Sequence, residues 1–374
     1  MSLTKQQHCI LEIIKDLDKS TTPNEIENVY KSRYKEMGDS SVYKQLERLI
    51  IDGLVKRLSH GKYGLTDKCM SLLYKKEEVS KEHSINFTEE EIKEFKEFAL
   101  SENCLDALTE MLNPALLGLQ KERLSALITL VSSKDQHNDR NRVTLLLTGP
   151  SSVGKSKIIE WMYHFLWGFW VENDASKSSL KGTGKGYQFS EGVLQKADNS
   201  IVYIDEIDKM TKNDQGSLLT AIELGTVKVN KDRVDRETWA RVRIIATCNN
   251  KGMVIEQLLN RFDIICDVKK LSDEERDMLI IKKTNDWNRE KLFGKGSNFL
   301  KRYLIFANQW ETKLPEDREW IGNYLLKEIN YGVLQSKDPR QVEAVYRIAL
   351  AIGKLRLHPE VVLDDLKKAM GILG

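Results

Sequence analysis

Hydrophobic residues near the start of the chain recur at helical spacing, which predicts a small helical domain. Ile10, Ile13, Ile14 and Leu17 repeat at i, i+3, i+4 and i+7, so we expect a first helix with one buried face. Thr22-Pro23-Asn24-Glu25 predicts the start of a second helix, since it combines a hydroxyl cap, a proline in the first turn and a glutamate three residues after the cap.

A third helix and a hairpin are expected next. Asp39-Ser40-Ser41 precedes apolar residues at helical spacing, and Gly53 marks the end of that helix. Residues 54–58 and 63–65 flank a polar turn and predict a β-hairpin. Three helices and a hairpin resemble a winged helix. Polar side chains suited to DNA phosphates and base edges would lie on its third helix and wing: Ser40, Tyr43, Lys44, Arg48, Lys56, Arg57 and Lys62. The alternative is a winged helix that contacts only protein.

The middle of the chain follows a different pattern, in which short apolar runs end in polar residues. Residues 142–148 read as a buried parallel strand and residues 157–162 as a helix. Between them Gly149-Pro150-Ser151-Ser152-Val153-Gly154-Lys155-Ser156 reads G-x-x-x-x-G-K-S, which predicts a phosphate-binding loop. Lys155 would contact the β- and γ-phosphates of ATP, and the Ser156 hydroxyl suits Mg²⁺. The alternative is an accidental glycine-rich turn, which the flanking strand and helix disfavour.

A second apolar run ends in adjacent carboxylates. Residues 200–204 predict a strand, and Asp205 and Glu206 follow it directly. In parallel sheets ligands bind at the carboxyl ends of the strands, so both carboxylates would face the nucleotide. We expect Asp205 to join Ser156 around Mg²⁺ and Glu206 to polarise the attacking water.

A third apolar run, residues 242–248, ends at Asn249. The amide of Asn249 could detect the γ-phosphate or hold the water, although asparagine is also common in ordinary turns. Further on, Arg261 is flanked by apolar residues. Its position suits a finger that enters a neighbouring subunit's site and stabilises the transition-state charge of phosphoryl transfer.

Composition narrows the class of protein. Of the 374 residues 41% are hydrophobic and 30% are charged, as in ordinary globular proteins, and the net charge of +2 limits DNA binding to local patches. The five cysteines form no C-x-x-C pair, which argues against a zinc site or a disulfide framework. Without a signal pattern or a long apolar run, we expect a cytoplasmic protein that does not bind membranes.

These motifs, in this order and followed by a helical region, look like those of an AAA+ ATPase, and the chain resembles the minichromosome maintenance (MCM) helicases over about residues 88–370. Asp205-Glu206-Ile207-Asp208-Lys209-Met210 is close to that family's signature. Asn260-Arg261-Phe262-Asp263 resembles its finger motif, with Asn in place of the usual Ser. Further segments that match the family are Leu271 to Asp277, Pro339 to Arg347 and Leu355-Arg356-Leu357.

The resemblance implies further roles. Arg340 corresponds to the sensor-2 arginine that reaches a neighbouring subunit's nucleotide. Residues 225–234 alternate like a hairpin arm, and Lys231 falls on the family's DNA-contacting lysine, with Lys228 and Arg233 nearby. From spacing alone this is equally an exposed hairpin with solvated lysines. The resemblance also implies a homo-oligomer, a hexamer, that acts on DNA beside other replication proteins.

The sequence departs from the family in three respects. No oligonucleotide-binding barrel is expected before residue 88, and a winged helix is expected at the N-terminal rather than the C-terminal end. Gly154 also stands where the family usually has Ala. Such a compact replication ATPase would suit a prokaryotic virus or mobile element.

We therefore expect an α/β fold in four parts: a winged-helix DNA-binding domain at 1–75, a linker at 76–87, an AAA+ core of parallel sheet covered by helices at 88–270, and a helical lid at 271–374. The expected activity is that of an ATP-dependent helicase. The alternatives are a replication initiator or helicase loader that uses ATP as a switch, and an AAA+ regulator that remodels a protein partner.

Overall fold

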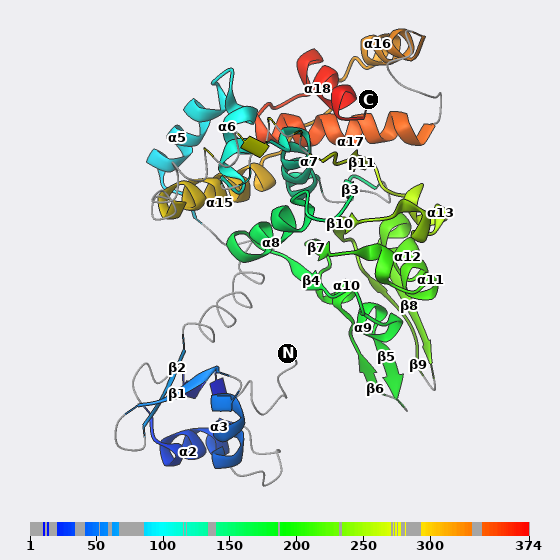
Figure 1. Ribbon diagram of the computed structural model, residues 1–374. Helices are drawn as coiled ribbons and strands as arrows, with labels where there is room; N and C mark the ends of the chain where they lie inside the picture. The colour runs from blue at the N-terminus through cyan, green and yellow to red at the C-terminus, as the bar shows by residue number, and fades with distance from the viewer. Residues whose placement is uncertain are drawn as a thin grey trace. The chain divides into compact units, whose positions relative to one another are not determined.

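The structure is a computed structural model, and it divides the chain into two compact units, Met1–Ile85 and Asn86–Gly374. Figure 1 shows both units, each of which is treated separately below. The described residues are 10–11, 13–14, 21–33, 42–51, 53–58, 62–66, 86–114, 116, 118–133, 140–185, 188–231, 234–270, 272, 274, 276–277, 281, 293–330 and 339–373.

In the first unit, helices pack against a two-stranded antiparallel sheet. The elements are α2 (Pro23–Arg33), α3 (Val42–Ile51), β1 (Val55–Arg57) and β2 (Tyr63–Leu65), and Val55 pairs with Leu65. The helix α2 begins with a capping box: the Thr22 amide donates to Glu25 Oε2 over 2.7 Å, and the Glu25 amide donates back to Thr22 Oγ1 over 3.4 Å. This arrangement is compatible with a winged helix.

The core of the first unit contains three of the four residues at helical spacing in the predicted first helix, and the fourth, Leu17, lies outside the described residues. Ile10, Ile13 and Ile14 are buried together with Leu46 and Leu49 of α3. Apolar side chains therefore hold the elements together while the polar face of α3 stays exposed. The predicted cap of the third helix, including Ser40, lies outside the described residues.

A five-stranded parallel sheet forms the centre of the second unit, which confirms the predicted α/β fold. The strand order is β11-β3-β10-β7-β4. All strands of this sheet are short, and β3, β7 and β10 are buried along their whole length. Their bounds are β3 (Thr144–Thr148), β4 (Phe169–Val171), β7 (Ile201–Ile204), β10 (Arg243–Cys248) and β11 (Ile264–Asp267).

The strand order determines which polar residues meet. The strand β10 lies between β3, which leads into the phosphate loop, and β7, which leads into Asp205 and Glu206. Parallel strands end at the same edge of a sheet, so three separate polar segments meet there. The sequence predicts β3, β7 and β10, but it predicts neither β4 and β11 nor this order.

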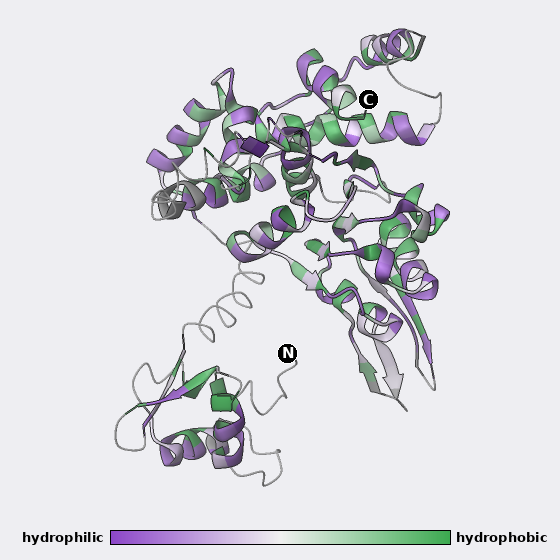
Figure 2. Cartoon of the chain, viewed as in Figure 1, coloured by the Kyte–Doolittle hydropathy of each residue, from purple (hydrophilic) through white to green (hydrophobic). Residues whose placement is uncertain are grey.

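Helices surround the sheet and continue beyond it to the C-terminal end (Figure 1). In Figure 2 the long helix α17 carries both hydrophobic and hydrophilic positions, and its buried side includes Val345, Ile348 and Ile352. The helices are α5 (Glu89–Ala99), α6 (Cys104–Met111), α7 (Gln120–Val131), α8 (Lys155–Phe165), α9 (Lys177–Lys181), α10 (Val193–Lys196), α11 (Lys212–Gly216), α12 (Leu218–Leu224), α13 (Glu256–Leu259), α15 (Phe293–Gln309), α16 (Glu319–Asn330), α17 (Pro339–Leu355) and α18 (Leu363–Leu373), with 3-10 turns η2 (Ile207–Lys209) and η3 (Lys251–Met253).

The C-terminal helices pack on the core through α7, which contacts both α15 and α17. At the start of this unit α5 has a capping box, in which Thr88 Oγ1 accepts from the Glu91 amide over 3.2 Å. Phe95 of α5 is buried against the rings of Tyr303 and Phe306 in α15. Ring packing therefore joins the first helix of this unit to α15, about 200 residues later in the sequence.

Two hairpins extend from the core in the same direction (Figure 1). One pairs β5 (Thr183–Lys185) with β6 (Gln188–Ser190), and the other pairs β8 (Thr226–Lys231) with β9 (Val234–Trp239). The second is the hairpin predicted from the alternating pattern after Gly225. The hairpins contact each other through β5 and β8.

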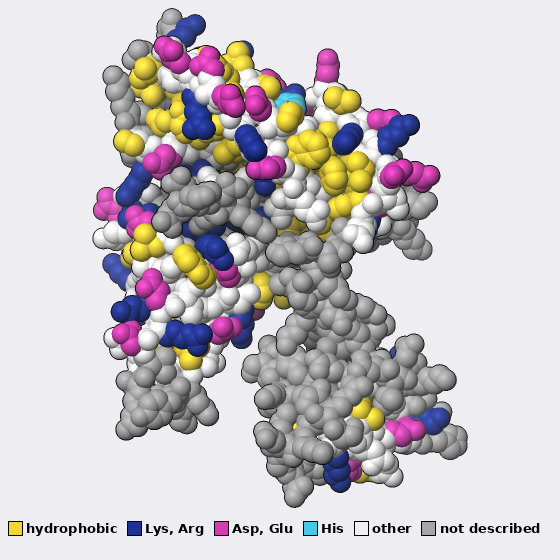
Figure 3. Space-filling view, turned by 180° about the vertical axis from the view of Figure 1, so that it is seen from behind, with side chains coloured by type: hydrophobic (Ala, Val, Ile, Leu, Met, Phe, Trp, Pro, Cys, Tyr) yellow, Lys and Arg dark blue, Asp and Glu magenta, His cyan; other side chains and the backbone are white. Residues whose placement is uncertain are grey.

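The surface carries both signs of charge. Figure 3 shows Lys and Arg side chains interspersed with Asp and Glu over the face it presents, as the small net charge requires. Within the described part of the chain, no helix has both the length and the apolar character needed to cross a membrane.

Candidate functional site

The phosphate loop is a tight turn between β3 and α8 whose two glycines are required by the backbone. Gly149 has a φ of 142° and Gly154 a φ of 97°, and a Cβ at Gly149 would lie 2.2 Å from the Val268 carbonyl oxygen. Ser152 also has a positive φ, of 68°. The other predicted loop residues, Pro150, Ser151 and Val153, lie in the same turn. The resulting curvature suits backbone N–H groups directed at an anion.

Lys155 begins α8 and reaches back over the loop. Its ammonium donates to the carbonyl oxygens of Gly149 over 2.7 Å and Pro150 over 2.6 Å, and to Asn249 Oδ1 over 3.1 Å. The residue is only 4% exposed, and this burial lowers its pKa. A cation is thus held between the phosphate loop and the end of β10.

Two side chains, one from α8 and one from β10, donate to Asp205. Its Oδ1 accepts from Ser156 Oγ over 2.8 Å and from Thr247 Oγ1 over 2.5 Å. Thr247 Oγ1 in turn accepts the Glu206 amide over 2.8 Å. The two residues predicted to hold Mg²⁺ are therefore adjacent, and Thr247, which the sequence did not single out, links both carboxylate residues.

Glu206 is held by three side chains. Its Oε1 accepts from Asn249 Nδ2 over 3.0 Å, and its Oε2 accepts from Asn173 Nδ2 over 3.1 Å and pairs with Lys209 over 2.5 Å. The Lys209 hydrogen bond is the largest of the effects that lower the pKa of Glu206. The backbone at Glu206 is left-handed, with a φ of 51°. This strained conformation directs an ionised carboxylate to the edge of the sheet.

Asp208 holds the segment that carries Asn249. Its Oδ2 accepts the amides of Asn249 over 3.1 Å and Asn250 over 3.0 Å. Its Oδ1 is buried and has no hydrogen-bond partner among the described residues. Against the larger effect of burial, the charge of Asp208 raises the pKa of Lys155, so this orphaned oxygen is a further acceptor in a site that already gathers carboxylates and hydroxyls.

The phosphate loop and the oxygen ligands around Asp205 fit a nucleoside triphosphate with Mg²⁺. The loop has the positive φ angles and the lack of space for a Cβ that characterise a cradle for phosphate. The Ser156 hydroxyl and the Asp205 carboxylate are the hard oxygen ligands that Mg²⁺ prefers beside phosphate oxygens.

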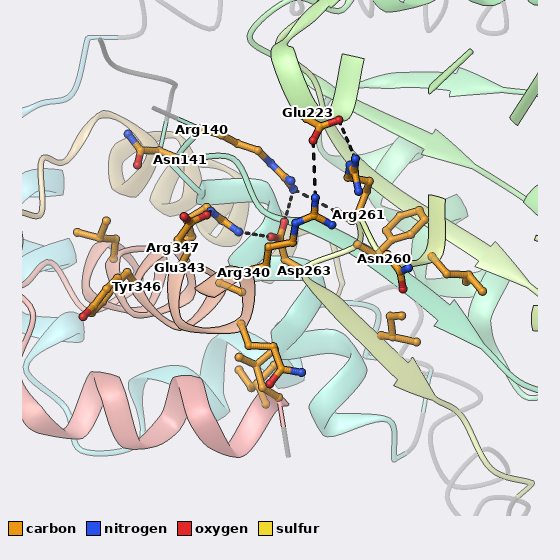
Figure 4. Close-up of a pocket in the computed structure, with 18 of the residues that line it drawn as sticks. Arg140, Asn141, Glu223, Asn260, Arg261, Asp263, Arg340, Glu343, Tyr346 and Arg347 are labelled. Carbon is orange, nitrogen blue, oxygen red and sulfur yellow. Dashed lines mark hydrogen bonds and ion pairs between the residues drawn. The ribbon is translucent and has the colours of Figure 1, made fainter. Parts of the chain in front are cut away.

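Arg261 and Arg340 meet in a separate pocket of about 880 Å³ (Figure 4). Glu223, near the end of α12, lies between them: Arg261 Nη2 is 2.9 Å from Glu223 Oε2, and Arg340 Nη2 is 3.9 Å from Glu223 Oε1. The structure therefore brings together the two predicted arginines, which are 79 positions apart in the sequence (340 − 261).

Asp263 forms the base of this pocket. Its side chain is 3% exposed and pairs with Arg347 of α17 over 2.7 Å and with Arg140 before β3. Figure 4 shows these groups converging from α17 and from the segments that precede β3 and β11. The ion pair between Asp263 and Arg347 fixes α17, which carries Arg340, to the segment that carries Arg261.

This arginine pocket and the phosphate loop lie at opposite ends of β3. The Arg261 carbonyl accepts from Thr144 Oγ1 over 3.1 Å, and Thr144 is the first residue of the strand. The phosphate loop follows Thr148, the last residue, about 13 Å further along at ~3.3 Å per residue. Neither arginine is near the phosphate loop of its own chain.

The candidate DNA-contacting residues lie on the hairpin and in the first unit. Lys231 is exposed and donates to Thr183 Oγ1 of the neighbouring hairpin over 3.2 Å. Lys228 is exposed and pairs with Asp235 over 3.4 Å. Arg233 lies outside the described residues. In the first unit Tyr43, Lys44, Arg48, Lys56 and Lys62 are all exposed.

Sequence reasoning missed Thr247, Asn173, Asp208, Glu223 and the Arg140–Asp263–Arg347 cluster. A threonine inside a buried strand gives no sequence signal, and neither does an isolated glutamate in a short helix. Asp208 had a local signal, because it stands two residues after Glu206, and Asp263 and Arg347 lay inside segments that resemble the family but were assigned no role.

Two family models match the chain. The model for the MCM P-loop domain matches residues 91–286, which is more than half of the 374 residues. This chain belongs to the MCM family. The match to the Ferric uptake regulator family covers residues 1–107, a smaller share, and is compatible with a winged helix in the first unit of this MCM protein.

Several curated relatives are similar to this MCM protein. The DNA replication licensing factor MCM5 of Arabidopsis thaliana is 25% identical over 338 residues, which cover 78% of this chain and 46% of the relative. An uncharacterised MCM-type protein of Methanocaldococcus jannaschii is 25% identical over 89% of this chain and 50% of its own length. The minichromosome maintenance protein MCM of Saccharolobus solfataricus is 24% identical over 86% of this chain and 51% of its own length. The chain thus spans about half the length of these relatives.

Proposed function

We propose that this MCM protein is an ATP-dependent DNA helicase or translocase that acts in DNA replication. It assembles as a homo-oligomeric ring or spiral, a hexamer, and hydrolyses ATP at the interfaces between subunits. The names of its relatives, which include DNA replication licensing factors, support a role in replication.

One side of each interface binds the nucleotide. When bound, ATP with Mg²⁺ supplies the phosphoryl group and the charge that offsets the phosphates. Lys155 and the loop N–H groups hold the phosphates, and Ser156 and Asp205 hold the metal. Glu206 orients and polarises the attacking water, and Asn249 links Lys155 to Glu206, so it responds to the γ-phosphate. The contacts of Asn249 with both groups support this role.

The other side of each interface comes from the next subunit, and the observation that carries the proposal is the position of its arginines. Arg261 and Arg340 share one pocket at the end of β3 opposite the phosphate loop. Two cationic side chains so placed can stabilise transition-state charge only in a neighbour's site. Arg340 and Arg261 therefore complete the site in trans.

The hairpin β8–β9 couples ATP hydrolysis at the subunit interface to DNA. It follows α12, the helix that carries Glu223 of the arginine pocket, with one residue between them. Lys231 near its tip would contact the DNA backbone, assisted by Lys228, and Arg233 is a further candidate. A change at the subunit interface would then move a DNA contact.

Mixing two inactive variants tests the shared site. Glu206→Gln lacks the group that polarises water but keeps its arginines, and Arg261→Ala has the opposite defect. We expect each alone to hydrolyse ATP slowly and their mixture to exceed the sum of both, since some interfaces combine intact halves. A mixture no more active than the sum would overturn the proposal of shared sites, provided both variants assemble as the wild type does.

An initiator or helicase loader is the second candidate. The match of residues 1–107 to a regulator family and the exposed Tyr43, Lys44 and Arg48 favour it. Such a protein would bind one DNA sequence far more tightly than others and turn over ATP without separating strands. Binding measurements with specific and scrambled duplexes, beside strand-displacement assays, distinguish the two functions.

A further inference from the structure

The carboxylate of Glu223 contacts both arginines of the pocket at once. Oε2 is 2.9 Å from Arg261 Nη2, and Oε1 is 3.9 Å from Arg340 Nη2 (Figure 4). The Glu223 side chain is 44% exposed, whereas that of Arg261 is 20% exposed. A half-exposed carboxylate thus holds a largely buried guanidinium at the pocket wall.

The side chain of Arg142 fixes the end of α12, the helix that carries Glu223. The Arg142 guanidinium donates to the carbonyl oxygens of Ala221 over 2.9 Å and Ile222 over 3.3 Å, at the end of α12. It also donates to the Val242 carbonyl over 3.0 Å, just before β10, and the residue is only 2% exposed. This buried cap ties the last turn of α12 to the sheet, so Glu223 projects from a rigid base.

Arg261 keeps hydrogen-bonding capacity beyond this contact. A guanidinium has five N–H donors in a fixed plane, and Glu223 engages one of its terminal nitrogens. The Nε of Arg261 is buried and has no hydrogen-bond partner among the described residues. Glu223 can therefore hold one edge of the group while other donors engage an anion.

We propose that Glu223 is a positioning residue that aligns Arg261 and Arg340 for the nucleotide of the neighbouring subunit. This inference rests on the proposed function, in which both arginines act in trans. Glu223 touches no phosphate itself. It fixes the orientation of two long side chains that would otherwise sample many rotamers.

The variant Glu223→Gln tests this role, since it preserves size and removes the charge. We expect kcat for ATP hydrolysis to fall about tenfold or more, while KM for ATP changes by less than about twofold, because the phosphate loop of each subunit is intact. In an Arg261→Ala background the same substitution should lower kcat by a smaller factor, because only the contact with Arg340 is then left to lose. Glu90→Gln, an exposed position on α5, is the matched control and should behave as wild type.

Mixing identifies the side of the interface that is affected. A mixture of Glu223→Gln and Glu206→Gln subunits should hydrolyse ATP faster than the sum of the two variants measured alone. The mixture of Arg261→Ala and Glu206→Gln subunits should do the same. The inference is overturned if Glu223→Gln turns over like wild type, or if its defect is not complemented while that of Arg261→Ala is. If the Arg261→Ala mixture itself shows no complementation, the shared site is wrong and the role of Glu223 is overturned with it.

Discussion

Thr247 joins the metal-site carboxylate to the backbone of the next catalytic candidate. Its hydroxyl donates to Asp205 Oδ1 over 2.5 Å and accepts the amide of Glu206 over 2.8 Å. One side chain of β10 therefore sets the relative position of two neighbouring groups that end β7. Hydrogen bonds to a charged group contribute about 1.5–3 kcal/mol, so this link has a measurable effect.

Thr247→Val retains the shape of the side chain and removes both hydrogen bonds. We expect ATP turnover to fall about tenfold or more, because Asp205 and Glu206 lose their common support and each ~1.4 kcal/mol in barrier is tenfold in rate. Thr247→Ser keeps the hydroxyl and should retain most activity. Steady-state ATPase rates of the two variants test this, and equal losses in both would contradict the claim that the hydroxyl alone supports the two residues.

Lys209 sets the pH range in which Glu206 is ionised. Because the Lys209 hydrogen bond lowers the pKa of Glu206 below its ordinary value of 4.5, the carboxylate stays charged until the pH falls through this lowered pKa. Lys209→Gln removes the cause, so the acid limb of the ATPase pH profile should move to higher pH. As a control, Lys212→Gln at an exposed position should leave the acid limb of the pH profile unchanged. If Lys209→Gln also leaves it unchanged, Lys209 does not control the ionisation of Glu206.

Asp263 stabilises the second unit through buried ion pairs. Asp263→Asn leaves Arg347 and Arg140 without their carboxylate in a buried setting, and breaking such pairs costs about 3–5 kcal/mol in the free energy of unfolding. Asp235→Asn breaks an exposed pair with Lys228 and should cost less than ~1 kcal/mol. All seven tryptophans lie beyond residue 86, so fluorescence during urea unfolding reports this unit alone.

Lys44 and Arg48 of α3 should contribute to DNA binding by the first unit. If each contacts a phosphate, Lys44→Ala and Arg48→Ala each reduce the slope of log affinity against log salt by about one. Lys31→Ala, an exposed lysine of α2 paired with Glu27, is the control for loss of charge alone. Equal effects of all three substitutions on the salt slope would contradict a specific binding face.

Much of the fold follows from local sequence pattern. Apolar runs that end in Gly149, Asp205 and Asn249 predicted three parallel strands and the polar groups at their ends. Their grouping depends on strand order, which is decided by tertiary packing and has no local signal. The contact between Lys155 and Asn249, 94 positions apart, exists because β10 lies beside β3.

The arginine pocket could be predicted only in part. The role of Arg261 was predicted from the apolar residues near it, and that of Arg340 from a family resemblance. Neither prediction indicated that one carboxylate, Glu223, would contact both arginines. Arg347 and Asp263 are 84 positions apart, and their ion pair depends on how α17 packs on the sheet. The roles assigned to these residues stay predictions until they are measured.

At Lys231 the sequence predicted the residue's exposure but not its contact. The sequence predicted an exposed lysine on a hairpin, and the structure has one. Its hydrogen bond to Thr183 joins two hairpins that sequence spacing alone did not connect.

Strand displacement on a forked DNA duplex with ATP and Mg²⁺ tests the central claim most directly, with wild type compared with Glu206→Gln and Lys231→Ala. We expect the wild type to separate the strands and both variants to fail, while Lys231→Ala still hydrolyses ATP. That result would establish that hydrolysis drives the hairpin along DNA. DNA binding and ATP turnover by the wild type without any strand displacement would contradict the helicase and favour an initiator or loader.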